Sequence, residues 1–217
     1  MWKILSKSLL LKVSIYIFSS LIVAISILTS KCFFDNHQIY FNDFSTIMKV
    51  STIAAFITII IIILLGKWGW KLVWNAPIIG RLLNRKVCPD LNGKWLGKIQ
   101  SNYSEEGQMV IKDVDVIIKV DFFGFSMKLE SQDNYQASIV IQADIYKDAR
   151  KKTFHVEYIF ESTVLSPKEN DDKSFQGAAR LDVKYDGNHI SLEGLYWTNR
   201  ASQRQLNTSG MIILTKK

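Results

Sequence analysis

Two long uncharged apolar stretches constrain this chain more than any other feature. Residues 13–30 hold 18 residues without a charge, and residues 50–66 hold 17. At about 1.5 Å of rise per residue, each makes a helix of roughly 25–27 Å, close to the ~30 Å hydrocarbon core of a bilayer. The lysines that border the stretches can extend to the headgroups and lengthen them: Lys12, Lys49 and Lys67. We therefore predict two transmembrane helices, over about 13–30 and 48–66.

Residues 1–66 thus form a predicted membrane hairpin, although a buried core helix or a cleaved signal peptide are alternatives for such stretches. Two of this length are uncommon in a soluble chain of 217 residues, and the first is too long for a signal peptide and is not followed by a convincing small-x-small cleavage site. The spans hold no Asp, Glu, Arg or His, so no charged pathway is visible. Small residues four apart favour close helix packing: Ser20 and Ala24, Ser51 and Ala55, Ala54 and Thr58.

The distribution of charge gives the orientation of the hairpin. The chain carries a net charge of +7, and residues 1–89 hold 10 Lys and Arg against 2 acids, a net charge of +8. Residues 90–217 hold 17 Lys and Arg against 18 acids, so the basic excess belongs to the membrane region and argues against a DNA or RNA partner. Lys and Arg flank the hairpin on both ends, which predicts a multi-pass membrane protein with both termini in the cytoplasm.

Residues 67–89 form a basic, aromatic linker between the hairpin and the rest of the chain. Trp68, Trp70 and Trp74 suit the aromatic belt of a membrane interface. Beyond Pro77, a short helix is predicted with isoleucine and leucine on one side and Arg81 and Arg85 on the other. Such a helix is typical of segments that lie on a membrane surface.

The two cysteines exclude a disulfide scaffold. Cys32 and Cys88 fall on opposite sides of the bilayer in the predicted topology, so they cannot pair within the chain. Two isolated cysteines also do not make a zinc site, and we predict no bound metal.

After Pro89 the apolar pattern changes from continuous to alternating, which indicates strands with one buried face. Successive inward faces are predicted at 114–120, 123–129, 137–145 (Ala137, Ile139, Ile141, Ala143, Ile145) and 154–160. With 93–100, 175–185, 189–199 and 210–216 the count is eight strands. Eight antiparallel strands in residues 90–217 predict a small up-and-down β-barrel, which has room for side chains or one small ligand.

The catalytic inventory of this domain is poor. Asp113 and Asp115 share a strand face, but the neighbouring outer faces are equally charged, so a solvated surface explains them. His155 falls on an outward strand position, and no Gly-x-Ser-x-Gly, phosphate-binding loop or Gly-x-Gly-x-x-Gly is present. We predict a binding protein without enzymatic activity or cofactor.

The best candidate binding residues run off the end of the seventh strand. Counting by two places Tyr196 and Arg200 on the core face, beside Trp197 and Asn199. An aromatic ring can stack on a base while a guanidinium binds phosphate in a bidentate manner, which suits a phosphorylated, base-bearing ligand. In the alternative, Arg200 caps the barrel by packing on Trp95.

Further candidates come from the neighbouring loops. Arg204 follows in a polar segment, and Gln100, Asn102 and Tyr103 leave the first strand, where they can line a rim. Loop polarity alone also explains the latter three. The complete predicted ligand-binding set is Trp95, Gln100, Tyr103, Tyr196, Trp197, Asn199, Arg200 and Arg204.

Two segments of the barrel carry a resemblance to a known family. The segment Pro89-Asp90-Leu91-Asn92-Gly93-Lys94-Trp95-Leu96-Gly97, with its Gly-x-Trp, and the segment Gly194–Arg200 follow two spans and a basic linker. This organisation resembles the two-transmembrane β-barrel effectors of CBASS antiphage defence. The resemblance implies a cytoplasmic barrel that senses a cyclic dinucleotide made by a partner nucleotidyltransferase (CD-NTase).

The same resemblance implies that ligand binding drives homo-oligomerisation and that the spans then disrupt the inner membrane and kill the infected cell. An apolar barrel interior disfavours so polar a ligand, so we expect binding at the mouth of the barrel or between two barrels. The alternative function is a constitutive membrane-tethered, lipocalin-like barrel that binds a protein partner or a small apolar ligand.

Overall fold

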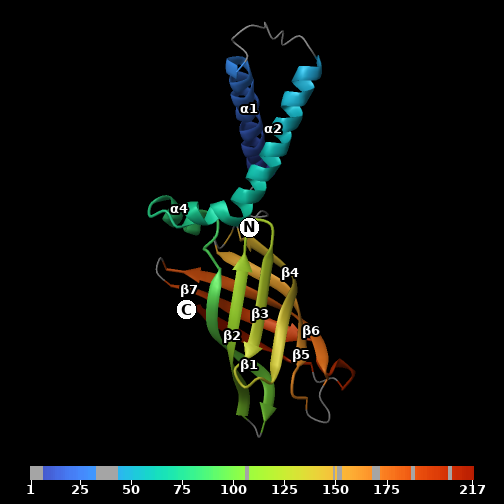
Figure 1. Cartoon of the computed structure of the whole chain (residues 1–217). Coiled ribbons are helices and arrows are strands. Elements are labelled where there is room, and N and C mark those ends of the chain that lie inside the picture. The colour runs from blue at the N-terminus through green and yellow to red at the C-terminus, as the bar shows by residue number, and fades with distance from the viewer. Residues whose placement is uncertain are drawn as a thin grey trace. The chain divides into compact units, whose positions relative to one another are not determined.

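The computed structural model describes residues 7–32, 44–105, 108–148, 150, 153–167, 172–186, 189–204 and 207–217. The described residues divide into two compact units, one ending at Leu72 and the other beginning at Val73. The first unit is helical and the second contains a closed β-barrel (Figure 1). Residues 33–43, which belong to the connection between the two predicted spans, fall outside the described residues.

The N-terminal unit consists mainly of two long apolar helices, α1 (Lys7–Cys32) and α2 (Phe44–Leu64). Both are long and apolar enough to cross a membrane. The predicted helical stretches therefore lie within observed helices. On α2, the side chains of Val50, Ala54 and Thr58 are buried and recur every four residues, which places one of the predicted small-residue pairs in a packed face.

After α2 the chain continues through a π-helical turn (Leu65–Gly69), α3 (Trp70–Trp74) and α4 (Ile79–Lys86). The chain from Val73 onward belongs to the barrel unit and is bonded to it. The Trp74 indole nitrogen donates to the Cys88 carbonyl at 2.9 Å, and its ring meets Phe122 edge-on at 5.9 Å between centroids. The predicted short helix after Pro77 is confirmed as α4.

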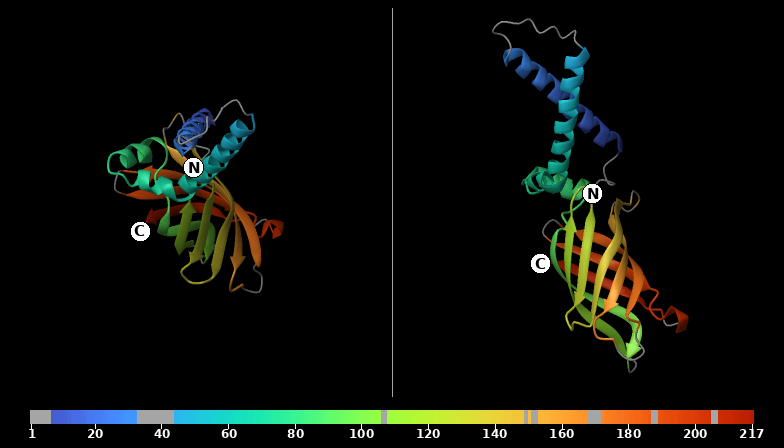
Figure 2. Two further views of the ribbon diagram at one scale, coloured as in Figure 1. Left: turned by 45° about the horizontal axis from the view of Figure 1, so that its top comes forward. Right: turned by 45° about the vertical axis from the view of Figure 1, so that its right-hand side comes forward.

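Eight antiparallel strands form the barrel, as predicted, and each pairs with its sequence neighbours (Figure 2). The circle closes where β1 pairs with β8, from Trp95 opposite Lys216 to Ser101 opposite Gly210. The strands are β1 (Gly93–Glu105), β2 (Gln108–Val120), β3 (Phe125–Ser131), β4 (Gln136–Lys147), β5 (Phe154–Val164), β6 (Ser174–Tyr185), β7 (Ile190–Thr198) and β8 (Ser209–Lys216).

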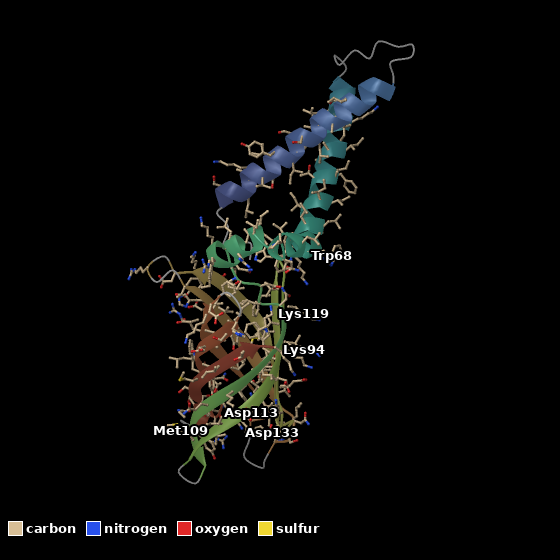
Figure 3. All side chains as sticks on the ribbon, turned by 90° about the vertical axis from the view of Figure 1, so that its left-hand side faces the viewer. Trp68, Lys94, Met109, Asp113, Lys119 and Asp133 are labelled. Carbon is tan, nitrogen blue, oxygen red and sulfur yellow. The ribbon has the colours of Figure 1, made fainter. Side chains whose placement is uncertain are left out.

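The two ends of the barrel differ. We call the end where β1 begins and β8 finishes the linker end, and the opposite end, where β7 finishes at Thr198, the mouth end. Figure 3 shows Lys119 toward the linker end and Met109 and Asp133 toward the mouth end. The linker end is filled by buried side chains, among them Trp95, whose indole nitrogen donates to the Leu91 carbonyl at 3.0 Å.

Alternation of side chains correctly predicts the core of most strands. Val114, Val116, Ile118 and Val120 are buried in β2, as are Phe154, Val156, Tyr158 and Phe160 in β5. The close approach of β6 and β7 requires glycine at residue 194, because a Cβ there would lie 2.0 Å from the Arg180 carbonyl oxygen.

The predicted inward face of β4 is wrong over its first half. Ile139 and Ile141 are 59% and 58% exposed, whereas Ser138 is buried. An irregularity in the pairing with β5, between Val140 and Gln142, shifts the alternation by one residue. Counting back by two from Ile145, which is buried as predicted, therefore gives the wrong face for the residues before the irregularity.

The predicted end of the first strand is also wrong, because β1 continues to Glu105. Asn102 and Tyr103 are strand residues, and the pairing with β2 resumes at Ser104 opposite Met109 after a shift in register. The polar composition of residues 101–105 concealed this extension, since it lacks an apolar face.

Candidate ligand-binding site

A cavity of about 590 Å³ occupies the mouth half of the barrel. This volume is within the range of pockets that hold small molecules. The aromatic residues of its lining are Tyr103, Tyr135, Tyr158, Phe160, Phe175 and Tyr196, and the cations are Lys112, Arg200 and Arg204. The apolar residues are Ile99, Val110, Val114, Met127, Leu129, Val140, Ala201 and Ile212. The polar residues are Ser101, Ser131, Gln136, Ser138, Thr198 and Thr208.

The aromatic side chains of the cavity come from inward positions of five different strands or their ends. Tyr158 and Phe160 lie on β5 with ring centroids 5.9 Å apart. Burial raises the pKa of the Tyr158 phenol. Burial also raises the pKa of Tyr196, against the opposing effects of a hydrogen bond to Ser101 and the charge of Arg200. Both phenols therefore stay protonated at neutral pH and can donate hydrogen bonds to a ligand.

A band of polar side chains crosses the cavity wall where β4 and β5 pair. The Gln136 amide nitrogen donates to the Ser162 hydroxyl at 3.0 Å, and the Ser138 and Ser162 hydroxyls also bond to each other. The Ser131 hydroxyl accepts from the Gln136 backbone N–H at 2.9 Å. The wall thus offers hydrogen-bonding groups inside an otherwise apolar barrel, where a buried polar ligand group would need them.

Arg200 lies at the mouth end on two aromatic rings. Its guanidinium carbon is 5.7 Å from the Tyr135 ring centroid and 5.3 Å from that of Phe175. An Nη2–H group also donates to the Tyr135 hydroxyl at 2.7 Å. These contacts hold the guanidinium plane at the cavity, where its donors can meet an anionic ligand.

The turn that follows Arg200 is held in a left-handed conformation. Ala201 has φ of 51°, which is uncommon for a residue with a Cβ. Its backbone N–H donates to the Asp172 carboxylate, which also lies 3.6 Å from an Nη2 atom of Arg204. Asp172 therefore fixes the turn that carries both arginines of the mouth.

Lys112 is the third cation of the cavity and pairs with the Asp133 carboxylate. The Lys112 ammonium, with further hydrogen bonds, lowers the pKa of Asp133 to about 2. Both side chains are about half exposed, so exchange of Asp133 for a ligand phosphate costs little.

The cavity contains four of the eight sequence-predicted site residues: Tyr103, Tyr196, Arg200 and Arg204. Trp197 and Gln100 point outward because they alternate with inward neighbours, and Trp197 is 52% exposed. The Asn199 side chain accepts a hydrogen bond from the Gln176 backbone at 2.7 Å. Trp95 lies at the linker end, so the alternative in which Arg200 packs on Trp95 does not hold.

Several cavity residues were missed by sequence reasoning. Tyr135 lies in the turn between β3 and β4, and its role depends on Arg200, 65 residues away. Ser138 and Gln136 were missed because of the irregularity in β4. Lys112 was missed because the charged residues near it in the sequence face outward. Counting back by two from the inward Val114 along β2 gives Lys112 an inward position, and this was the signal that could have found it.

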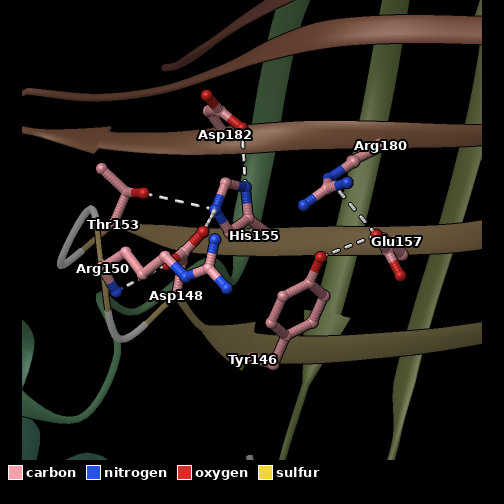
Figure 4. Close-up of polar contacts among 8 residues, drawn as sticks. All are labelled: Tyr146, Asp148, Arg150, Thr153, His155, Glu157, Arg180 and Asp182. Atoms are coloured by element: carbon pink, nitrogen blue, oxygen red, sulfur yellow. Dashed lines mark hydrogen bonds and ion pairs between the residues drawn. The ribbon is translucent and has the colours of Figure 1, made fainter.

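A second polar cluster lies on the outside of the barrel near the linker end (Figure 4). His155 is 2% exposed, although its strand position faces outward as predicted. Its Nδ1–H donates to Asp182 at 2.7 Å, and its Nε2 is 3.2 Å from the Thr153 hydroxyl and 3.9 Å from Asp148. The Tyr146 ring covers it at 5.4 Å between centroids, so this cluster joins β4, β5 and β6 rather than forming a pocket.

The fold and the cavity together define a class of protein: a closed β-barrel with a cavity of ligand size that follows two apolar helices. Residues 86–216 match the family described as "Cap15, cyclic dinucleotide receptor domain". The chain is also 31% identical over 186 residues to CD-NTase-associated protein 15 of Escherichia albertii, covering 82% of this chain and 87% of that relative.

The chain therefore belongs to the Cap15 family of CBASS effectors, and the resemblance found in the sequence is confirmed. The alignment covers a larger share of the chain than residues 86–217 alone, so the similarity extends into the region before the barrel. The family is one of receptors and effectors rather than of known enzymes.

Proposed function

We propose that the cavity at the mouth end binds a cyclic dinucleotide made by a partner CD-NTase. The observation that carries this proposal is the combination, in one cavity of about 590 Å³, of aromatic rings, a polar wall and three cations, in a domain that matches a cyclic dinucleotide receptor family. A cyclic dinucleotide presents two bases and two phosphates, so it needs stacking surfaces, hydrogen-bond partners and positive charge together.

The arrangement of the lining indicates how such a ligand would sit. The rings of Tyr158, Phe160 and Phe175 offer stacking surface inside the barrel, and the polar groups of β4 can bond base edges. Arg200 and Arg204, which stand at the mouth, are positioned for the phosphates. The mouth is the best place for a charged phosphate, because burying its charge deep in the barrel without water or a paired cation costs free energy. The proposed binding set is therefore the stacking rings of Tyr158, Phe160 and Phe175, the Ser138 hydroxyl of β4, and Arg200 and Arg204 for the phosphates, with Tyr103, Tyr135 and Tyr196 as the other aromatic residues of the lining.

The two apolar helices are proposed to cross the bacterial inner membrane, with residues 1–66 as the hairpin, 67–89 as the linker and 90–217 in the cytoplasm. Ligand binding would then assemble barrels into homo-oligomers. Assembly raises the effective concentration of the tethered hairpins, which would disrupt the membrane and kill the phage-infected cell. The buried face of α2, with Ala54 and Thr58, supports close packing of the two helices within each hairpin, and the contacts between hairpins belong to the proposal.

The test of binding is a calorimetric titration of the full chain in nanodiscs with cyclic dinucleotides. Loss of the Arg200 charge-assisted bonds in Arg200→Ala should weaken binding by at least about tenfold, since such bonds contribute about 1.5–3 kcal/mol. Arg180→Ala is the matched control, because Arg180 lies on the outer face and pairs with Glu157. Equal binding by both variants would contradict the assignment of the cavity.

The test of the effector step is toxicity in cells that produce the ligand. Deletion of residues 1–66 should leave binding intact and abolish killing. Harmless overexpression of the full chain in those cells, together with assembly that does not depend on ligand, would instead support a constitutive tethered barrel.

A further inference from the structure

We propose that α4 and the residue before it form a lipid-docking surface, by which the barrel unit rests on the anionic cytoplasmic leaflet. This inference rests on the membrane location in the proposed function, but it concerns a part of the molecule that neither spans the membrane nor binds the ligand. Its consequence is a fixed orientation of the cavity.

The outer side of α4 is apolar and exposed in the barrel unit. Ile78, Ile79 and Leu82 are 83%, 52% and 53% exposed. At 100° per residue, Ile78 and Leu82 project 40° apart and Ile79 lies next to them. Arg81, Arg85 and Lys86 are also exposed. On the same count Arg81 and Arg85 border this apolar stripe, and Lys86 projects between Leu82 and Ile79, where its long side chain can extend to the headgroups. Such a helix can bury its apolar side chains among acyl chains and meet anionic headgroups with its charges.

The opposite side of α4 is turned toward its own unit. Gly80 is buried, and its backbone N–H donates to the Ala76 carbonyl at 2.7 Å. A Cβ at Gly80 would lie 2.0 Å from the Trp74 carbonyl oxygen, so the turn before α4 closes tightly on the helix. Leu83 and Asn84, on the same side as Gly80, are half-buried. The exposed apolar side is therefore the side that has no cover within the described part of this unit.

The barrel holds α4 through several bonds near its C-terminal end. The Lys147 ammonium, at the end of β4, donates to the Lys86 carbonyl at 3.2 Å. The Asn84 side-chain oxygen accepts from the Asp90 backbone N–H at 3.2 Å, and the Lys216 ammonium donates to the Asp90 carbonyl at 2.6 Å. These contacts make α4 part of the linker end of the barrel rather than an independent tether.

The occupant of the apolar side is identified by its neighbourhood in the chain. Ile78 lies six residue steps after Leu72, at the end of the helical unit, and six steps span at most about 22 Å. The stripe is thus confined to the vicinity of the proposed membrane surface, and its basic residues complement anionic lipid. A second protein would need to compete with a bilayer that is always within reach.

The docking would orient the binding cavity. The contacts of α4 are with the linker end, through Lys147 and the chain near Cys88, whereas the cavity lies in the mouth half. With α4 on the leaflet, the mouth opens away from the bilayer and toward the cytoplasm. A soluble nucleotide would then reach Arg200 without passing the lipid surface.

Spin-label accessibility of the full chain in vesicles tests this surface. Single labels are placed by Ile78→Cys and Leu82→Cys in a Cys32→Ser background, in which the remaining Cys88 is buried, with Met109→Cys at the mouth end as the matched exposed control. In vesicles that contain phosphatidylglycerol, we expect an oxygen-to-nickel-chelate accessibility ratio several-fold higher at 78 and 82 than at 109. In purely phosphatidylcholine vesicles the difference should shrink.

Each other outcome overturns the docking. Ratios at 78 and 82 equal to that at 109 would leave the helix in water. Low access to both reagents, with dipolar broadening between labels, would place a second copy of the chain on the stripe. Two measurements on the same vesicles separate these results from failure of the proposed function. Absence of binding in a cyclic dinucleotide titration, or release of the chain from the membrane by carbonate extraction, would count against the proposed function rather than against the docking alone.

Discussion

The buried histidine of the outer cluster gives the sharpest test of how the barrel is held together. Replacing His155 by alanine removes the Nδ1–H bond to Asp182 at 2.7 Å and the contact of Nε2 with the Thr153 hydroxyl at 3.2 Å. It also leaves a gap beneath the Tyr146 ring. The cluster joins three neighbouring strands, so its loss should lower the free energy of unfolding of the whole barrel.

The magnitude follows from the exposure of the partners. A hydrogen bond to a carboxylate contributes about 1.5–3 kcal/mol, and the lower end applies because water can replace the imidazole at a partner as exposed as Asp182. The Thr153 contact adds about 1 kcal/mol, and the gap beneath Tyr146 adds about another. The sum of about 3.5 kcal/mol corresponds to a fall in Tm of roughly 7–14 °C for a unit of this size.

Urea unfolding of the full chain in nanodiscs, followed by tryptophan fluorescence, measures the change. His189→Ala is the matched control: this exposed histidine lies in the turn between β6 and β7, and its loss should cost less than about 0.5 kcal/mol. Thr153→Val should cost about 1 kcal/mol. If His155→Ala unfolds within about 0.5 kcal/mol of the parent, the cluster does not stabilise the barrel and the reasoning is refuted.

Three further predictions concern other parts of the barrel unit. Burial raises the pKa of the Cys88 thiol to about 12, so peptide mapping should find Cys88 alkylated slowly at pH 8 in the folded chain and rapidly in urea. The free energy of unfolding should also fall as pH rises above 9 toward 12, because the thiol ionises first in the unfolded chain. Rapid labelling of the folded chain would contradict this prediction. The pKa of Asp133 is lowered to about 2, so its pair with Lys112 contributes to the free energy of unfolding above pH 3.8, and this contribution is lost as pH falls toward 2. Asp133→Asn should remove this acid dependence at a cost below about 1 kcal/mol, measured in acid titrations followed by circular dichroism. Gly194→Ala forces a Cβ against the neighbouring strand and should destabilise the barrel by about 2 kcal/mol or more in thermal unfolding, whereas Gly124→Ala, whose Cβ meets nothing closer than 3.8 Å, should be nearly neutral.

Local pattern accounts for most of the fold. Long uncharged runs predicted both apolar helices, and strict alternation predicted the number, order and buried faces of most strands. The pattern failed at Ile139 and Ile141, where one irregular position moves two isoleucines to the outer face. The pattern also failed to predict that the first strand continues through Tyr103, because the polar end of this strand has no apolar face that alternation could reveal.

The candidate site was predictable only in part. Tyr196 and Arg200 share a face by counting along one strand, and the structure brings both to the cavity. Neighbours in sequence, such as Trp197, were included although alternation sends them outward. Tyr135 comes from the turn between β3 and β4 and Ser138 from β4, and both join Arg200 in one cavity only when the barrel closes.

The sequence by itself determined the division into apolar helices and an alternating β domain, because hydrophobic length and periodicity are local properties that each segment carries alone. Only the tertiary structure decided that the mouth half of the barrel is hollow and its linker end filled. Closure of β1 on β8 sets which distant side chains meet, and a single-residue shift in β4 reverses which of them face the cavity.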